Sequence, residues 1–389
     1  MLLDVRKPQN YLDVAVSLSK ELADSVNEGN AQVGISGNEI ERLRKSGLLA
    51  LVVPQEYGGI GATWSDAFKV VQELSQADGF IGQVYGNHLN LTSLAHVSGT
   101  PEQKKRYYQH TARNNWFWAN AINTWDTGLR IIPEGDNFRF NGVTSFDAVV
   151  AAADLRVFSA VQDGAGEPFF FIIPRDREGI ISNHAEDNLG QGGSDRTTFT
   201  FHNVLVRKDE ILQPLKPSDS AFSTILGIIA QLTKIYVCLG VARGALEAAQ
   251  KYSSTLSNSW NAGGVESTTH EPYGLGNYSD LWLELKTAIK LTDRVADMVQ
   301  IAWEKELTLT HEEREEIAIA VFSAETFATR IGLDISNRIF ELIGTPSKDT
   351  NYGFDRYWRD LHTFGGVSMP WQGAPQNWKL TNFQQQTPW

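Results

Sequence analysis

Apolar positions repeat with a helical period in the first and last thirds of the chain and with a strand period in the middle. In the first third, the helical repeat is carried by Leu12, Ala15, Val16, Leu22 and Val26. Residues 100–103 (TPEQ) are typical of a helix start, because Thr can cap the helix, Pro fits its first turn and Gln can complete a capping box. Residues 57–61 (YGGIG) predict a loop, since glycine tolerates positive φ and close backbone approach.

The middle third contains short β-prone runs with no helical pattern between them. They lie at residues 116–124, 137–143, 155–161, 169–173, 197–201 and 204–206. Residues 163–166 (DGAG) separate two of these runs and predict a hairpin. Several short strands joined by glycine-rich turns predict an antiparallel sheet or a small barrel.

From about Ser218 onward, the helical period returns in longer stretches. One apolar stripe consists of Leu281, Leu285, Ile289, Val295 and Val299. Residues 310–313 (THEE) form a second capping-box pattern, and the helix that they open is expected to run to about Ile343. Long helices joined by few turns predict a bundle.

These patterns together predict an α+β fold with three domains. We expect an N-terminal α-helical domain at residues 1–114, a β-barrel or β-sheet domain at 115–214 and a C-terminal helical bundle at 215–389. Hydrophobic residues make up 42% of the chain and charged residues 21%, which is ordinary globular usage and supplies enough apolar surface for large cores.

The net charge and the cysteine content limit the classes of binding partner and the cellular compartment that we expect. A net charge of -12 disfavours binding to nucleic acid or to anionic lipid. Cys238 is the single cysteine, which fits a reducing compartment and a cytoplasmic location. We see neither a secretory signal nor an apolar run approaching the roughly 18 residues of a membrane span, so no membrane association is expected. Eleven Trp fit a planar cofactor or core packing, and composition does not separate the two.

Common catalytic and binding motifs are missing from the sequence. The Gly-x-x-x-x-Gly-Lys-Ser/Thr and Gly-x-Gly-x-x-Gly patterns do not occur in a context that would support ATP hydrolysis or a Rossmann nicotinamide site. His-Glu-x-x-His, Cys-x-x-Cys and Gly-x-Ser-x-Gly are also absent from the sequence. No metal site is therefore expected.

Three segments match a known family in order and spacing. They are residues 47–59 (GLLALVVPQEYGG), 138–146 (FRFNGVTSF) and 189–206, which begins LGQGGSD and ends FTFHNVLV. On the basis of these segments, the chain resembles the acyl-CoA dehydrogenase superfamily from about residue 11 to residue 362. The resemblance implies an N-terminal helical domain, a central antiparallel β-domain and a C-terminal four-helix bundle, assembled as a homotetramer or homodimer.

Further segments are similar to the flavin-dependent monooxygenase branch of that superfamily, which includes dibenzothiophene monooxygenase and related sulfur-acquisition oxidoreductases. These are residues 86–89 (GNHL), 99–103 (GTPEQ), 236–252 (YVCLGVARGALEAAQKY), 271–273 (EPY) and 352–359 (YGFDRYWR). The branch implies a two-component, FMN-dependent monooxygenase. A separate flavin reductase supplies reduced FMN, which reacts with O₂ to give a C4a-hydroperoxide that oxidises a small hydrophobic, sulfur- or nitrogen-containing substrate.

Two alternatives remain. An FAD-dependent acyl-CoA dehydrogenase or oxidase needs a carboxylate base. The family places that base near the C-terminus, where no Asp or Glu follows Asp360, or on the first bundle helix, where the matching position is near Thr233. The other alternative is a degenerate homologue that keeps the fold as a binding or assembly module.

The resemblance assigns two histidines to catalysis. His88 matches the active-site histidine of the N-terminal helices, and its implied role is to hydrogen-bond the peroxyflavin or to donate a proton. A helix-packing histidine is the competing interpretation. The branch also has two C-terminal histidines, and here the ungapped matches are Phe364 and Val367 while His362 lies nearby.

The resemblance also assigns the flavin contacts, which are Asn120, Asn123, Thr124, Trp125, Phe146, Ala148, Arg356 and Arg359. Asn120 and Asn123 are expected at the pyrimidine edge of the ring, with Thr124 and Trp125 completing that wall. Phe146 is expected to cover one face of the ring, or else to belong to the core of the β-domain. Ala148 stands where the branch has Ser.

The phosphate side of the cofactor is expected to be altered. Arg356 and Arg359 are the candidate phosphate ligands, with a salt bridge inside the bundle as the alternative role. Asn258 stands where the branch has an Arg for the phosphate, and charge-assisted Arg–phosphate bonds are strong.

Overall fold

The computed structural model describes residues 10–27, 37–122, 129–162, 168–184, 196–212, 220–255, 272–343 and 353–364. The chain divides into two compact units, residues 1–219 and 220–389. The first unit contains helices followed by strands, and the second contains helices. The predicted α+β architecture is therefore confirmed, whereas the three-domain division at residues 114 and 214 stays a prediction.

The first unit begins with helices whose ends carry the local signals expected of them. They are α1 (Tyr11–Asn27), α2 (Gly37–Ser46), η1 (Leu48–Ala50), η2 (Gln55–Tyr57), α3 (Trp64–Ala77), α4 (Gly79–Thr92), α5 (Leu94–Ser98) and α6 (Pro101–Asn114). Thr100 and Gln103 form the predicted capping box at the start of α6. Asp78 caps α4 by accepting hydrogen bonds from the N–H groups of Phe80 and Ile81.

The glycine-rich segment at residues 57–61 is a loop, as predicted, that packs back on η1. Gly58 and Gly61 have φ of +93° and +68°, a region that L side chains rarely adopt. A Cβ at Gly59 would lie 2.0 Å from the carbonyl oxygen of Val53. The N–H of Ile60 donates to the carbonyl oxygen of Ala50 at 3.1 Å. The glycines thus allow the loop to hold η1 in place.

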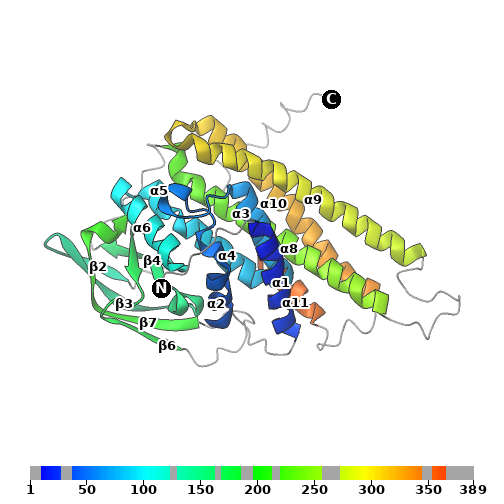
Figure 1. Cartoon of the computed structure of the whole chain (residues 1–389), viewed down its shortest axis with the longest axis horizontal. Helices are drawn as coiled ribbons and strands as arrows, with labels where there is room; N and C mark the ends of the chain where they lie inside the picture. The colour runs from blue at the N-terminus through cyan, green and yellow to red at the C-terminus, as the bar shows by residue number, and fades with distance from the viewer. Residues whose placement is uncertain are drawn as a thin grey trace. The chain divides into compact units, whose positions relative to one another are not determined.

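The strands of the first unit form one 8-stranded sheet in the described ranges (Figure 1). They are β1 (Trp118–Ala121), β2 (Arg130–Glu134), β3 (Asn137–Asp147), β4 (Leu155–Gln162), β5 (Pro168–Pro174), β6 (Ile180–His184), β7 (Arg196–Val206) and β8 (Ile211–Leu212). The path is β6-β7-β3-β2-β4-β5-β8, and β1 pairs with β4. The predicted antiparallel pairing of β4 with β5 is confirmed, but β4 runs parallel to both β1 and β2.

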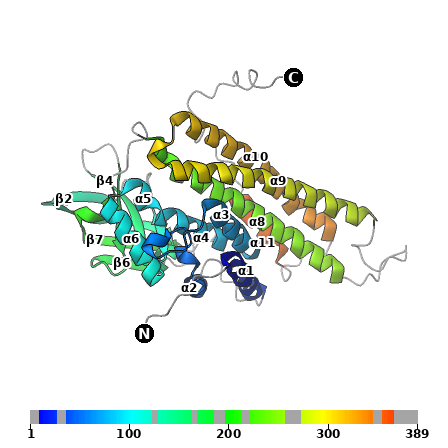
Figure 2. The same cartoon turned by 45° about the horizontal axis from the view of Figure 1, so that its top comes forward.

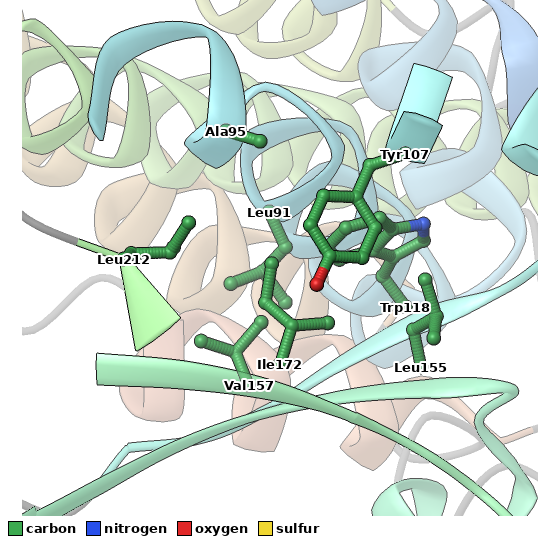
Figure 3. Close-up of a cluster of buried hydrophobic side chains, with 8 residues drawn as sticks. All are labelled: Leu91, Ala95, Tyr107, Trp118, Leu155, Val157, Ile172 and Leu212. Atoms are coloured by element: carbon green, nitrogen blue, oxygen red, sulfur yellow. The ribbon is translucent and has the colours of Figure 1, made fainter. Parts of the chain in front are cut away.

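Two apolar clusters stabilise this sheet. On one face, Phe140 packs against Phe158, Phe171 and Phe201, with ring centroids 4.5 to 5.7 Å apart. On the other face, side chains from α4, α5 and α6 meet side chains from β1, β4, β5 and β8 (Figure 3). Trp118 lies in this second cluster with the ring of Tyr107 edge-on at 5.5 Å. The start of β1 is therefore buried against the helices.

The second unit is a helical bundle, as predicted. Its elements are η4 (Ala221–Thr224), α8 (Ile225–Thr255), α9 (Pro272–Lys305), η6 (Glu306–Thr308), α10 (His311–Ile343) and α11 (Phe354–Phe364). Figures 1 and 2 show α8, α9 and α10 lying side by side, and α11 packs against α8 and α10. Thr310 and Glu313 exchange the two hydrogen bonds of the predicted capping box.

Helix α8 is more apolar than the sequence reading allowed. Residues 221–253 are long and apolar enough to cross a membrane by length and composition, which corrects the expectation that no such run exists. Of the most apolar window, 72% is buried inside the protein, among α9, α10 and α11. A helix that is hydrophobic on all sides is explained by such burial. Cys238 lies on this helix and is buried, as expected.

Candidate functional site

Asn120 is the polar side chain that β1 carries beyond its buried start. Trp118 pairs with Leu155 of β4 and is fully buried, while Asn120 pairs with Val157 and is exposed. The Asn120 Oδ1 accepts a hydrogen bond from the N–H of Ile122 at 2.8 Å. Among the residues that the structure describes, no partner for Nδ2 is found. The amide NH₂ is therefore a donor presented at the end of β1.

The end of β3 reaches the same region through the phenylalanine cluster. Ala121 of β1 pairs with Phe158 of β4, and the ring of Phe158 lies 5.8 Å from the ring of Phe146. Phe146 is 7% exposed and also packs against Phe199, so it belongs to the core of the sheet. A role for Phe146 at a flavin face stays a prediction. Ala148 follows β3 at the start of the short helix α7 (Val149–Ala152) and is half-buried.

Arg156 is a buried cation in this region that sequence reasoning did not single out. It is 4% exposed, and its guanidinium donates to the carbonyl oxygens of Val150 and Ala151 at 2.8 and 3.0 Å. The same group lies 5.4 Å from the centre of the Phe199 ring. Burial lowers the pKa of Arg156 to about 10. A single charged residue inside the apolar run LRVFSAV is the signal that marks it.

His88 is fully buried, and main-chain groups occupy both of its ring nitrogens. The N–H of Trp118 donates to Nδ1 at 3.0 Å, so the ring hydrogen lies on Nε2, which donates to the carbonyl oxygen of Leu49 at 2.8 Å. Burial lowers the pKa of His88 to about 4. Both ring nitrogens are thus hydrogen-bonded to main-chain groups, and the expected role of His88, which is to hydrogen-bond the peroxyflavin or to donate a proton, stays a prediction.

The second unit holds the other predicted catalytic residue. His362 is exposed on α11, with its ring 3.9 Å from the ring of Trp358. Its Nδ1 donates to the carbonyl oxygen of Trp358 at 2.8 Å. Nε2 points to no described partner, so a catalytic role for His362 stays a prediction.

The two predicted phosphate ligands lie on the same helix. Arg356 donates to the Tyr357 hydroxyl at 2.9 Å and lies over that ring. Arg359 pairs with Asp355, four residues earlier, and its side chain is 56% exposed. The ion pair with Asp355 uses only some of the five N–H donors of the Arg359 guanidinium.

A surface pocket of about 550 Å³ lies between α10 and α11. Its lining consists of Asn337, Phe340, Asp355, Trp358 and Arg359. The indole N–H of Trp358 donates to Asn337 Oδ1 at 3.1 Å, which fixes the aromatic wall of the pocket. A guanidinium in this pocket suits a ligand that carries a phosphate.

Several predicted residues lie outside the described residues. These are Asn123, Thr124, Trp125, Asn258 and Val367. The described donors fit FMN in kind. Asn120 offers an amide N–H to the oxygen and nitrogen acceptors of a flavin ring edge, and Arg359 offers charge-assisted donors to a phosphate.

Comparison with known protein families gives two matches. Residues 13–115 match the acyl-CoA dehydrogenase N-terminal domain. Residues 232–368 match the acyl-CoA dehydrogenase C-terminal domain.

Three individual proteins are similar along nearly the whole chain. The probable FMNH2-dependent monooxygenase SfnC of Pseudomonas putida is 35% identical over 92% of this chain and 90% of its own length. Dibenzothiophene monooxygenase of Mycolicibacterium goodii is 35% identical over 90% of this chain and 88% of its own length. The crystal structure of FMN-bound TdsC from Paenibacillus sp. A11-2 has a TM-score of 0.83 at 32% identity and covers 91% of this chain and 92% of that chain.

Proposed function

Because the chain belongs to the acyl-CoA dehydrogenase superfamily, in its flavin-dependent monooxygenase branch, we propose that it is a two-component, FMN-dependent monooxygenase. Its substrate is a small hydrophobic molecule that contains sulfur or nitrogen. FMN, when bound in its reduced form, would supply two electrons and two protons, and a separate flavin reductase would deliver it. One atom of O₂ would then be transferred to the substrate and the other would leave as water, with oxidised FMN as the remaining product.

The observation that carries this proposal is the full-length similarity to FMN-dependent monooxygenases, together with a hydrogen-bond donor at the end of β1. FMN, when bound, supplies the redox chemistry. The residues of the chain bind it, orient it and exclude water. Asn120 would donate to the ring edge, and the packed rings of Phe146, Phe158 and Phe199 would keep this part of the sheet rigid. Arg356 and Arg359 remain the proposed phosphate ligands.

The dehydrogenase alternative is the less favoured function. The bundle position expected for a carboxylate base is Thr233, whose side chain is 1% exposed and donates its hydroxyl to the carbonyl oxygen of Ile229 at 2.9 Å. A hydroxyl engaged in this way cannot remove a proton from carbon at neutral pH. A reaction with O₂ needs no such base, which favours the oxygenase.

We also propose that the enzyme is cytoplasmic and that it assembles as a homotetramer or homodimer. The reducing compartment is supported by a single buried cysteine. Assembly through the bundle is supported by large apolar side chains exposed on α9, at Leu283, Leu291 and Ile301. Light scattering of the purified protein will give the oligomeric state.

The proposal predicts selectivity for FMN over FAD and dependence on a reductase. In a fluorescence titration, we expect the Kd for FMN to be about tenfold lower than the Kd for FAD. With NADH, a flavin reductase and FMN, dibenzothiophene or indole should be oxidised, and omission of any component should abolish the product. If the protein instead oxidises an acyl-CoA with bound FAD and passes the two electrons to an added acceptor, the dehydrogenase assignment replaces this one.

A further inference from the structure

Strand β1 is held against the helices at its start and presents Asn120 two residues later. We infer that His88 is a positioning residue that fixes β1, and through it Asn120, and that it takes no part in proton transfer. This inference rests on the proposed function, since Asn120 is the proposed contact to the flavin ring. It replaces the catalytic role that family resemblance gives to His88.

His88 makes two hydrogen bonds to main-chain groups. Its Nδ1 accepts the N–H of Trp118 at 3.0 Å, and its Nε2 donates to the carbonyl oxygen of Leu49 at 2.8 Å. The ring also stacks on Phe117 with centroids 5.5 Å apart. One side chain of α4 therefore ties η1 to β1, at a depth where an unsatisfied N–H or C=O is costly.

A second, independent contact holds the same end of β1. Asp154 Oδ2 accepts the N–H of Phe117 at 2.8 Å and pairs with the guanidinium of Arg44 at 2.5 Å. Arg44 also donates to the carbonyl oxygen of Asn115 at 3.3 Å. The N–H groups of Phe117 and Trp118 are thus both bound by side chains, from opposite directions along the chain.

The indole of Trp118 completes this arrangement. Its N–H donates to the Thr111 hydroxyl at 2.9 Å, and Tyr107 packs edge-on against its ring. Figure 3 shows Trp118 enclosed by Tyr107, Leu155 and their neighbours. The first residues of β1 are fixed by these contacts, whereas Asn120 is exposed. A small rotation of the fixed part would therefore move the amide of Asn120.

Two isosteric substitutions separate the two bonds of His88. In His88→Asn, the side-chain oxygen lies near the place of Nδ1 and keeps the bond to Trp118. In His88→Gln, the amide nitrogen lies near the place of Nε2 and keeps the bond to Leu49. His110→Asn is the matched control, because His110 stacks on Trp116 at 5.1 Å and is exposed.

The first readouts are hydrogen exchange of residues 116–122 in the flavin-free protein and the Kd for FMN. We expect His88→Asn and His110→Asn to keep the exchange protection and an FMN Kd within about threefold of wild type. We expect His88→Gln to lose protection in this segment and to weaken FMN binding about tenfold. Normal FMN binding in both His88 variants with loss of oxygen transfer in both would overturn the inference and make His88 catalytic.

A measurement on the wild-type protein covers the case in which a variant does not fold. Nuclear magnetic resonance of the His88 ring should show the Nε2–H tautomer, with no titration between about pH 5 and pH 8. A ring that titrates in that range contradicts the inference. If wild type binds no FMN while the exchange and ring data are as expected, the proposed function fails and the positioning role of His88 stands.

Discussion

Replacing Glu210 by alanine is expected to lower the free energy of unfolding by about 3–5 kcal/mol, because it leaves a buried guanidinium without its partner. Glu210 pairs with Arg177, and their side chains are 8% and 9% exposed. Glu210 Oε2 also accepts the N–H of Arg207 at 2.8 Å, and Arg177 donates to the carbonyl oxygen of Leu205 at 2.8 Å. The substitution thus removes one carboxylate and strands two donors.

Asp209 provides the matched control for this substitution. It is the neighbouring residue in sequence and pairs with Arg106, but the two side chains are 54% and 35% exposed. Asp209→Ala is expected to cost at most about 1 kcal/mol, since water can replace the lost partner. Urea unfolding followed by circular dichroism measures both variants. Equal losses for Glu210→Ala and Asp209→Ala would show that burial does not determine the strength of these pairs.

The wild-type protein is expected to lose about 3 kcal/mol of stability through His88 as the pH falls from about 6.5 to about 4. Burial is the main cause that lowers the pKa of His88 from 6.5 to about 4, and the charge of Arg44 acts in the same direction. The hydrogen bond to Leu49 opposes this shift in part. In the unfolded chain the ring binds a proton below about pH 6.5, while in the folded chain it stays neutral. Stability is therefore fully present above that pH and is lost below it.

His88→Asn separates this contribution from the protonation of carboxylates. The variant keeps an acceptor for Trp118 but has no group that titrates in this range. The difference in free energy of unfolding between wild type and variant should shrink by about 3 kcal/mol between pH 6.5 and pH 4. A difference that stays constant over this range would mean that the folded ring titrates near its ordinary pKa.

Local signals in the sequence were sufficient to predict several elements. The capping boxes at Thr100–Gln103 and Thr310–Glu313 depend on residues three positions apart, and both form as predicted. The glycines of residues 57–61 predicted a loop, and this prediction also depends only on neighbouring residues. Short-range stereochemistry determines these features, so a single sequence is enough to read them.

Features that depend on distant partners were not predictable in this way. Asp154 and Arg44 are 110 residues apart, and no pattern in the sequence joins them. The parallel pairing of β1 with β4 follows from the path of the chain and not from the alternation within either strand. For His88, no pattern in the sequence indicated its partners, which are two main-chain groups. Residue types do not indicate which main-chain groups a side chain will bind.

In the proposed reaction, one oxygen atom of O₂ is transferred to an organic substrate and reduced FMN is oxidised. The most direct measurement is mass spectrometry of the product after turnover under ¹⁸O₂, with the protein, FMN, a flavin reductase, NADH and dibenzothiophene or indole. We expect one ¹⁸O atom per product molecule and no label when ¹⁸O is supplied as water. Product oxygen that comes from water, or NADH consumption that yields only hydrogen peroxide while FMN is bound, would contradict the proposed reaction.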